Sequence, residues 1–589
     1  MYSTSKHQSH ESQSLLSSFL RNEAIRQGVN NRHQAGFCLT SKAAILILTW
    51  TVLVGTLHFT VRISMSLLIY SSPLTDINVA LPYVVLSFII MLLFVFYPLS
   101  GYLADVWCGR FRTIVASVTL LLFSTTLCLR CLLPWYMFKL SLNNNVLYSV
   151  VVISLFVSII SIAGYGANFI QFGLDQLLES PSHHQALFTH WAKWCYDLTN
   201  IGILFLVCLA RCYGSTLTAE VISIASLYAL FGFVFLSLFL FSYWKRHWFN
   251  SEPGHHNPYK IVIKVLNFAW KHKQIFQRSA FTYCDDERPS RLDFAKERFG
   301  GPFTTEQVED VKTLIKVVVI LLAVGPVFIL DPPSSAPLMA LINSHLTRQL
   351  DFCSWDWIVV TSGLLRYIAS TFFLPIYIWV IFVLFHKRTP KIFCHLGFGI
   401  LLYLLGILLI YIVDVIGHIQ HQGNDTQCFY IAPNNISKYY DISYLEMHWT
   451  VNIPSNVLVG IGSTILTVTI LEFISAQSPY SMKGLLFGTH FAITGVYQFL
   501  SSCLSVPFIS RKLPPSDGVH RPHIGCLFGY LLLLCLIAFA DLILFTVAAK
   551  WYKYQERDDR PYDHRFVIDV YNRYLNQAQG CQCSDSESD

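Results

Sequence analysis

Charged side chains lie inside several long apolar segments, where each needs a partner or contact with water. A charged group at the centre of a membrane-spanning helix costs about 2.5–3.5 kcal/mol. Arg62 and Glu472 are the most informative pair, because they lie in opposite halves of the chain and carry opposite charges. A guanidinium binds a carboxylate and a carboxylate binds an amine, so together they could hold the two ends of a zwitterion. The remaining members of this set are Lys193, Asp197, Arg366, Asp414 and Asp541, with the histidines His58 and His490.

A structural ion pair is the alternative explanation for each of these residues. We favour it for Asp414 and Asp541, which lie near the end of a span or without an obvious partner.

The composition identifies the class of protein that must position these groups. Of 589 residues, 54% are hydrophobic and 13% are charged, and the mean hydropathy is +0.49. Soluble domains carry about 25% charged residues, so soluble, disordered and disulfide-dense secreted chains are excluded. The net charge of +6 does not indicate a nucleic-acid partner. We find no nucleotide-binding loop, catalytic triad or metal-ligand cluster, and therefore expect neither an enzyme nor a bound cofactor.

Roughly twelve segments have the length of about 20 apolar residues that a spanning helix needs. We therefore predict an all-α polytopic membrane protein of two six-helix bundles, with a cytoplasmic tail at 1–42, bundles at 43–244 and 311–550, a cytoplasmic linker at 245–310 and a second cytoplasmic tail at 551–589. Two halves around a linker are typical of a repeat-built transporter. The predicted spans are 43–71, 78–104, 112–136, 146–173, 188–211, 217–244, 311–331, 355–385, 392–416, 448–474, 484–507 and 524–550.

The distribution of Lys and Arg places both termini and the linker in the cytoplasm. This orientation puts the sequons at Asn424 and Asn435 outside, where they would be glycosylated. Leu15 and Leu16 end an acidic dileucine pattern that sorting adaptors could bind. The sequence is therefore consistent with either the plasma membrane or endolysosomes as the location. A basic, amphipathic helix is predicted around 258–278, either on the inner membrane surface or as a solvated connector.

The segment from Gly101 to Arg110 resembles the GxxxDxxGR loop of the major facilitator superfamily. That resemblance implies gating roles for Asp105, Gly109 and Arg110. Further stretches resemble the signatures of proton-dependent oligopeptide transporters. They are FGLDQ at 172–176, YDLTNIG at 196–202, LEFISAQSPYSMK at 471–483 and the lead-in to the seventh span at 291–312. The resemblance extends from residue 43 to about 575.

The resemblance implies specific roles for residues of this chain. Glu472 would hold the amino terminus of a peptide, and Arg62 would face its carboxylate or the coupling carboxylates. Tyr196 and Asn200 would line or brace the pocket, and Asp331 would belong to the extracellular gate. Protons would serve as the coupling ion.

The chain also departs from the family pattern. The two glutamates of the first-helix motif ExxERFxYYG fall at His58 and Val61, and the fourth-helix lysine falls at Gly166. His58 could titrate in place of the glutamates, or it could be a neutral packing histidine. Lys193 could supply the missing positive charge.

These observations predict a membrane-embedded secondary transporter of short peptides or peptide-like solutes, coupled to protons and working by alternating access. One alternative is a transporter of small anions or polar metabolites without proton coupling. Another is a transport-incompetent membrane scaffold or sensor. The expected partners are the small substrate and membrane lipid, and no nucleic acid.

Overall fold

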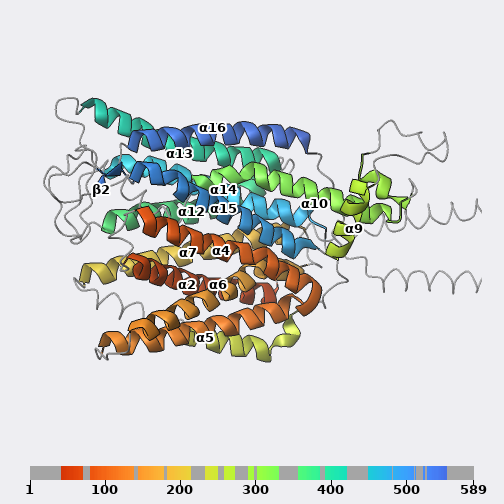
Figure 1. Ribbon diagram of the computed structural model, residues 1–589, viewed down its shortest axis with the longest axis horizontal. Helices are drawn as coiled ribbons and strands as arrows, with labels where there is room; N and C mark the ends of the chain where they lie inside the picture. Colours follow the sequence, from red (N-terminus) through yellow and green to blue (C-terminus); the bar gives the residue numbers. More distant parts are fainter. Residues whose placement is uncertain are drawn as a thin grey trace, which may run out of the picture.

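The computed structural model describes most of the helical part of the chain. The described residues are 41–70, 80–137, 144–177, 182–213, 232–249, 258–271, 290–297, 301–330, 356–384, 392–420, 449–479, 482–509, 511–512, 522–523 and 527–552. Nearly all of them are helical (Figure 1). The exceptions include β1 (Arg511–Lys512) and β2 (Pro522–His523), which pair antiparallel with Arg511 opposite His523.

Every predicted span contains a described helix, although residues 217–231 of the sixth span lie outside the described part. The first half contains α2 (Lys42–Tyr70), α4 (Ala80–Leu103), α5 (Arg110–Met137), α6 (Asn144–Asp175), α7 (Ser182–Tyr213) and the apolar helix Gly232–Trp244. The second half contains α10 (Thr305–Val324), α12 (Asp356–Leu384), α13 (Ile392–Gln420), α14 (Ile453–Gln477), α15 (Lys483–Ile509) and α16 (Leu527–Trp551). Shorter helical turns are η2 (Ala104–Cys108), η3 (Arg246–Trp248), η5 (Asp293–Ala295), η7 (Gly325–Ile329) and η8 (Trp449–Asn452).

These helices have the length and composition of membrane spans. Within the described residues, six helices are long and apolar enough to cross a membrane, and three shorter apolar helices accompany them. In a bilayer the backbone must satisfy its own hydrogen bonds, which a helix does within one segment. The predicted all-α membrane fold is therefore confirmed. The boundaries given for the five domains stay a prediction.

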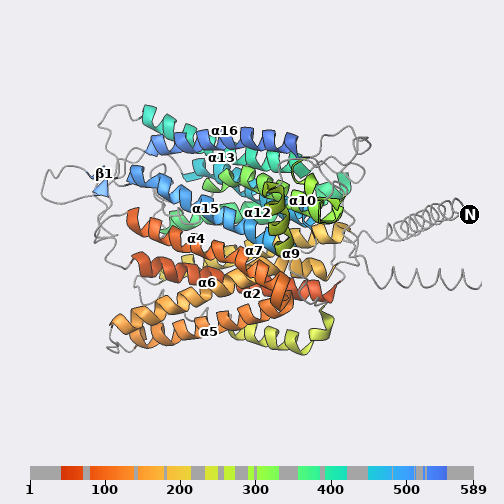
Figure 2. The same ribbon diagram turned by 45° about the vertical axis from the view of Figure 1, so that its right-hand side comes forward.

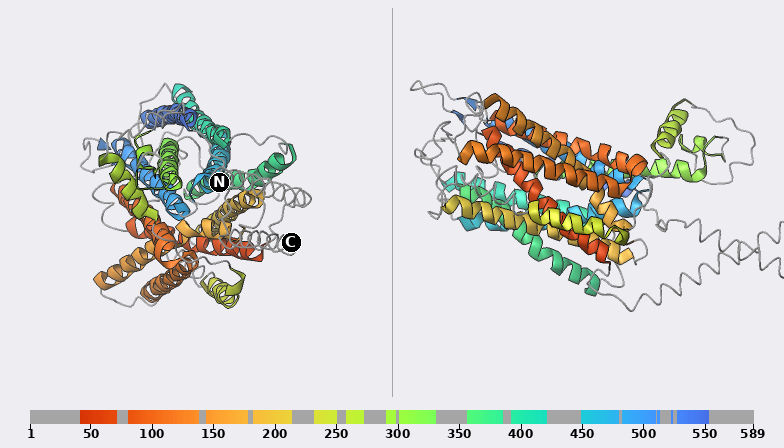
Figure 3. Two further views of the ribbon diagram at one scale, coloured as in Figure 1. Left: turned by 90° about the vertical axis from the view of Figure 1, so that its right-hand side faces the viewer. Right: turned by 90° about the horizontal axis from the view of Figure 1, so that it is seen from below.

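The helices of the two halves form two groups that meet along the middle of the molecule. Figure 3, in the view along the helices, shows the first half from red to yellow on one side and the second half from green to blue on the other. The contacts between the halves join α4 to α15, α6 to α15, and α7 to both α12 and α14. Figures 1 and 2 both show α4 beside α15.

Glycines set the separation of α4 and α15. A Cβ atom built on Gly101 would lie 2.4 Å from the carbonyl oxygen of Gly484, and one on Gly488 would lie 2.7 Å from the Cα of Pro98. Such distances are well below a normal contact, so the two backbones touch where side chains would otherwise stand. The contact thus depends on residues without a side chain.

The linker helix α9 (Pro258–Lys271) lies at one end of the helices, beyond the start of α10 (Figure 1). Its apolar face packs on the protein, where Val262 and Val265 join a cluster with Val308 and Val311 of α10. The helix predicted for 258–278 is thus present as far as Lys271, and residues 272–278 lie outside the described part. Its opposite face leaves Trp270 81% exposed.

Candidate functional site

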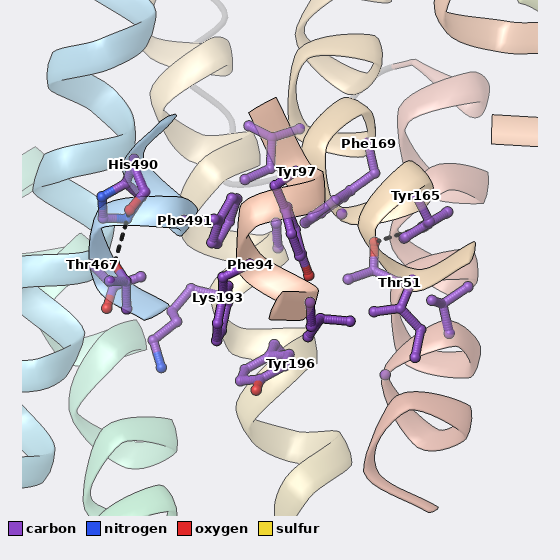
Figure 4. Close-up of a pocket in the computed structure, with 18 of the residues that line it drawn as sticks. Thr51, Phe94, Tyr97, Tyr165, Phe169, Lys193, Tyr196, Thr467, His490 and Phe491 are labelled. Carbon is purple, nitrogen blue, oxygen red and sulfur yellow. Dashed lines mark hydrogen bonds between the residues drawn. The ribbon is translucent and has the colours of Figure 1, made fainter. Parts of the chain in front are cut away.

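A central cavity of about 330 Å³ lies where the two halves meet (Figure 4). The first half lines it from α2, α4, α6 and α7, and the second half from η7, α12, α14 and α15. Aromatic rings provide much of the wall, namely Phe94, Tyr97, Tyr165, Phe169, Tyr196, Phe328, Tyr367 and Phe491. Pockets of roughly 300–1,000 Å³ with apolar walls and a few polar groups are typical of small-molecule sites.

Lys193 supplies a cationic group to this cavity. Figure 4 shows its side chain extending from α7 toward Thr467 and beside the rings of Phe94 and Tyr196. The ammonium lies 2.5 Å from Oδ1 of Asp197, one turn along the same helix, and 5.8 Å from the centre of the Tyr196 ring. Among the described residues that line the cavity there is no carboxylate.

Asp197 connects this lysine to the other half of the molecule. Its carboxylate is completely buried and accepts a hydrogen bond from the hydroxyl of Ser370 on α12. The Ser370 hydroxyl in turn accepts a hydrogen bond from Thr464 on α14. A polar chain therefore runs from the cavity lysine across the contact between α7, α12 and α14. It keeps a buried charge satisfied, as a low-dielectric interior demands.

A second polar cluster lies where α4 ends. Asp105 sits in the π-helical turn η2, and Arg110 begins α5 after Gly109, whose φ of 76° is readily adopted by glycine. Arg110 Nη2 lies 3.2 Å from Asp105 Oδ1, and its Nη1 lies 2.6 Å from Asp175 Oδ2 on α6. The spacing of this loop thus brings Asp105 and Arg110 together, as the sequence suggests.

Asp105 also reaches the second half and the linker. Its Oδ2 accepts the backbone N–H of Leu485 in the first turn of α15 at 3.3 Å. The same oxygen accepts the Tyr259 hydroxyl of α9 at 3.0 Å. Burial and the neighbouring Asp105 carboxylate raise the pKa of this tyrosine above its usual value. The loop is therefore bound to helix α15 and to the linker at once.

Comparison with known proteins decides the family. A model of the POT family matches residues 118–512, which is most of the chain. The chain belongs to the POT family. POT proteins are membrane transporters and not enzymes, so this is a multi-pass integral membrane protein of a transporter family.

Solved structures and a curated relative agree with this assignment. The POT transporter PepTSo has a similar fold, with a TM-score of 0.59 at 15% identity, over 88% of this chain and 100% of that one. A POT structure in complex with 5-aminolevulinic acid has a TM-score of 0.55 at 12% identity, over 88% and 99% of the two chains. "Protein NRT1/PTR FAMILY 7.2" of Arabidopsis thaliana is 28% identical over 127 residues. That match spans only about a fifth of the relative, 21% of each chain.

Two residues predicted for the site of this POT protein lie on α7. Tyr196 lines the cavity. Asn200, one turn further on, is buried outside the lining, and its side-chain nitrogen makes no hydrogen bond to any described residue. Their roles in binding stay predictions.

Glu472 does not line this cavity, although its neighbour Leu471 does. Its Oε1 lies 3.3 Å from Nδ1 of His190 on α7, so the carboxylate belongs to the contact between the two halves. The predicted partner Arg62, like His58, lies in the helical backbone of α2, but its side chain is outside the described part. Whether Arg62 and Glu472 act as a pair therefore stays a prediction.

Several predicted residues are outside the described part of the chain. They are Leu15, Leu16, Asp331, Asn424 and Asn435.

The structure explains why this chain has a glycine, Gly166, where the family has its fourth-helix lysine. Gly166 lines the cavity, and a Cβ atom there would lie 2.4 Å from the Tyr97 ring. The Tyr97 side chain therefore occupies the space that a longer residue would need. Lys193, on the neighbouring wall, supplies a cation instead.

The ion pair expected for Asp541 is not found in the described residues. The Asp541 side chain is buried in α16, and neither of its oxygens has a hydrogen-bond partner among them. Arg366, by contrast, donates from Nε to Oδ1 of Asn456 at 3.0 Å.

Sequence reasoning missed His190 and the aromatic walls. His190 precedes Lys193 by one turn of α7, and this spacing places both on one side of the helix. That spacing was the available signal. The rings of α4, α6 and α15 gave none, because aromatic residues occur on every face of these helices.

Proposed function

We propose that this protein is a secondary transporter of short peptides or peptide-like solutes. It moves them by alternating access between the two halves and uses the proton gradient. The observation that carries this proposal is the cavity between the halves, whose aromatic walls surround the ammonium of Lys193. Its volume suits a solute of a few residues, and a similar POT structure contains the small amino acid 5-aminolevulinic acid.

In this proposal Lys193 binds the substrate carboxylate. Asp197 takes one hydrogen bond from the ammonium, which leaves donors for a second anionic group. Tyr196 and the other rings contact the substrate side chains. Glu472, beyond Leu471 at one end of the cavity, receives the amine on Oε2 while Oε1 stays beside His190.

The remaining assignments complete the cycle. Asp105, Gly109 and Arg110 control opening at the end where α9 lies, and Asp331 controls the opposite end. Arg62, Asn200 and His58 support the binding of substrate and proton. Both termini face the cytoplasm, Asn424 and Asn435 carry glycans outside, and Leu15 and Leu16 bind sorting adaptors. The protein resides in the plasma membrane or in endolysosomes.

Uptake into proteoliposomes tests the proposal. A labelled dipeptide should accumulate when the outside is acidic, and Lys193→Ala should reduce this uptake sharply. Lys264→Ala is the matched control, because it removes an exposed lysine of α9 far from the cavity. Equal uptake by the two variants would exclude Lys193 from the site.

A transporter of small anions is the second candidate. It is favoured by one observation, that the described lining contains Lys193 but no carboxylate to receive an amine. Competition separates the candidates. Nitrate or a monocarboxylate should displace the substrate if the site takes anions, whereas dipeptides should have no effect.

A further inference from the structure

His190 and Glu472 make a titratable contact between the two halves. The imidazole Nδ1 lies 3.3 Å from Glu472 Oε1 and 2.7 Å from the carbonyl oxygen of Ala186. The His190 side chain is 8% exposed and that of Glu472 is 23% exposed, so both are largely shielded from water. The histidine comes from α7 in the first half, and the glutamate from α14 in the second half.

Other titratable groups surround this contact. The ring of Tyr377 on α12 stacks with the His190 ring at 6.0 Å, and its hydroxyl lies 2.9 Å from Nδ1 of His395 on α13. On α7 itself, Lys193 lies one turn away but is paired with Asp197. The neighbours therefore include one ring hydroxyl, one further imidazole and a lysine–aspartate pair with no net charge.

The contact lies just beyond one end of the cavity. On α7 it is one turn before Lys193, and on α14 it directly follows Leu471, both of which line the cavity. This is the end where α7 begins and α14 finishes. The first turn of α15, which bonds to Asp105, follows α14 at the same end. If opening of this end separates α7 from α14, it breaks the contact.

We propose that His190 and Glu472 together form the proton site that couples proton movement to opening of this end of the cavity. The proposal rests on the proposed transport function. With one proton shared between them the pair has no net charge, as either an ion pair or two neutral groups. Without that proton an uncompensated carboxylate would be left in a contact that is largely shielded from water, which is costly. The closed contact therefore binds one proton tightly.

Opening releases the proton. When α7 and α14 separate, water solvates both groups, and in water an imidazole has a pKa of about 6.5 and a carboxyl group one of about 4.3. At neutral pH the pair then loses its proton to the solution at this end. After the empty carrier has closed this end without the proton, the pair regains one from water in the cavity while the other end is open. One proton crosses for each cycle, without any change in covalent bonds.

Two kinds of transport separate this role from a structural one. Counterflow exchanges labelled for unlabelled dipeptide without a gradient, whereas accumulation requires the proton. Wild-type proteoliposomes should show both, with acidification of the lumen reported by trapped pyranine. His190→Gln should keep counterflow but lose accumulation and substrate-dependent acidification. His247→Gln is the control, because it removes an exposed histidine of η3.

A second variant covers the case in which His190→Gln does not fold. His190→Lys keeps a cation beside Glu472 at every working pH, so exchange should become slow and independent of pH. Accumulation and acidification equal to wild type in either variant would overturn the proposed proton site. Absence of counterflow in the wild-type protein for every dipeptide would overturn the transport function, and the proton site with it.

Discussion

Replacing Lys193 by methionine should destabilise the protein as well as abolish transport. Methionine keeps the apolar stem but removes the ammonium that lies 2.5 Å from Asp197. The two side chains are 9% and 0% exposed, so the remaining carboxylate would be buried without a cation. Removing one partner of a buried ion pair costs about 3–5 kcal/mol. We expect a loss of unfolding free energy near the lower limit, because Asp197 still accepts a hydrogen bond from Ser370.

A second substitution separates the stabilising role of Lys193 from its proposed role in binding. Asp197→Asn keeps an oxygen that can accept from Ser370 and removes the buried negative charge. In Lys193→Met/Asp197→Asn most of the lost stability should return, and contacting residues typically show coupling energies of roughly 0.5–3 kcal/mol. Transport should not return, because the ammonium is still missing. Unfolding in mixed detergent micelles gives the four stabilities of the cycle, and dipeptide counterflow gives the activity.

Two results would contradict this reasoning. If Lys193→Met unfolds like wild type, the pair does not stabilise the contact between α7 and α12. If the double variant transports dipeptides at the wild-type rate, then Lys193 has no place in the binding site, whatever its effect on stability.

Three further predictions concern the contacts at the linker end and between α4 and α15. Tyr259→Phe removes the hydroxyl that donates to Asp105 at 3.0 Å. Thermal unfolding should show that the free energy of unfolding falls by about 1.5–3 kcal/mol. An unchanged midpoint would show that this hydrogen bond does not stabilise the protein. Gly101→Ala places a methyl group 2.4 Å from a backbone oxygen of α15. Overpacking should therefore lower the free energy of unfolding by about 1–3 kcal/mol in the same assay. An unchanged stability would show that α4 and α15 can move apart without cost. Although burial acts in the opposite direction, hydrogen bonds from Lys296, Lys312 and Ser290 lower the pKa of Asp293 below 3.8. The stability that this ionised carboxylate contributes is fully present above that pH and is lost as the pH falls further. Asp293→Asn should therefore increase hydrogen exchange in α9 at pH 7. Equal exchange in the variant and the wild-type protein would contradict this prediction.

The helices could be predicted from the sequence because the bilayer imposes a length. Long apolar runs and the polar interval between the halves were enough to place every span. The beginnings of α7 and α10 were the clearest differences, since these helices start at Ser182 and Thr305 and the predicted spans start at 188 and 311. Residues 182–187 include polar side chains, and a helix that extends beyond the apolar region is invisible to a hydropathy criterion.

The rotation of each helix could not be predicted. Adjacent residues on a helix point about 100° apart, so Leu471 can line the cavity while Glu472 contacts His190. The helices are apolar on most faces, and polarity therefore does not reveal which face is inward. Lys193 could be identified from the sequence as a candidate. Its place in the cavity wall could not be derived, for the same reason.

Short-range pairs were more accessible than long-range ones. Asp105 and Arg110 are five residues apart, and their loop spacing brings them together. Their other partners, Asp175, Tyr259 and Leu485, come from distant parts of the chain. Only the packing of α6, α9 and α15 around the loop determines those contacts, and no local pattern encodes it.

Two of the contact regions between the halves differ in chemistry, and this difference bears on how the protein could open. Along α4 and α15, glycines such as Gly101 and Gly488 let backbones touch. Along α7, the contacts to α12 and α14 include the polar pairs of Asp197 with Ser370 and of His190 with Glu472, beside an apolar cluster in which Leu187 packs with Leu374, Ile378 and Val468. Water or a substrate can replace polar contacts of this second kind, since a hydrogen bond to a charged group has a net value of only about 1.5–3 kcal/mol. Neither water nor a substrate can replace close backbone packing, because helices that move slightly apart lose their van der Waals contacts. Movement that separates the halves should therefore begin along α7, with α4 and α15 as the line about which they turn.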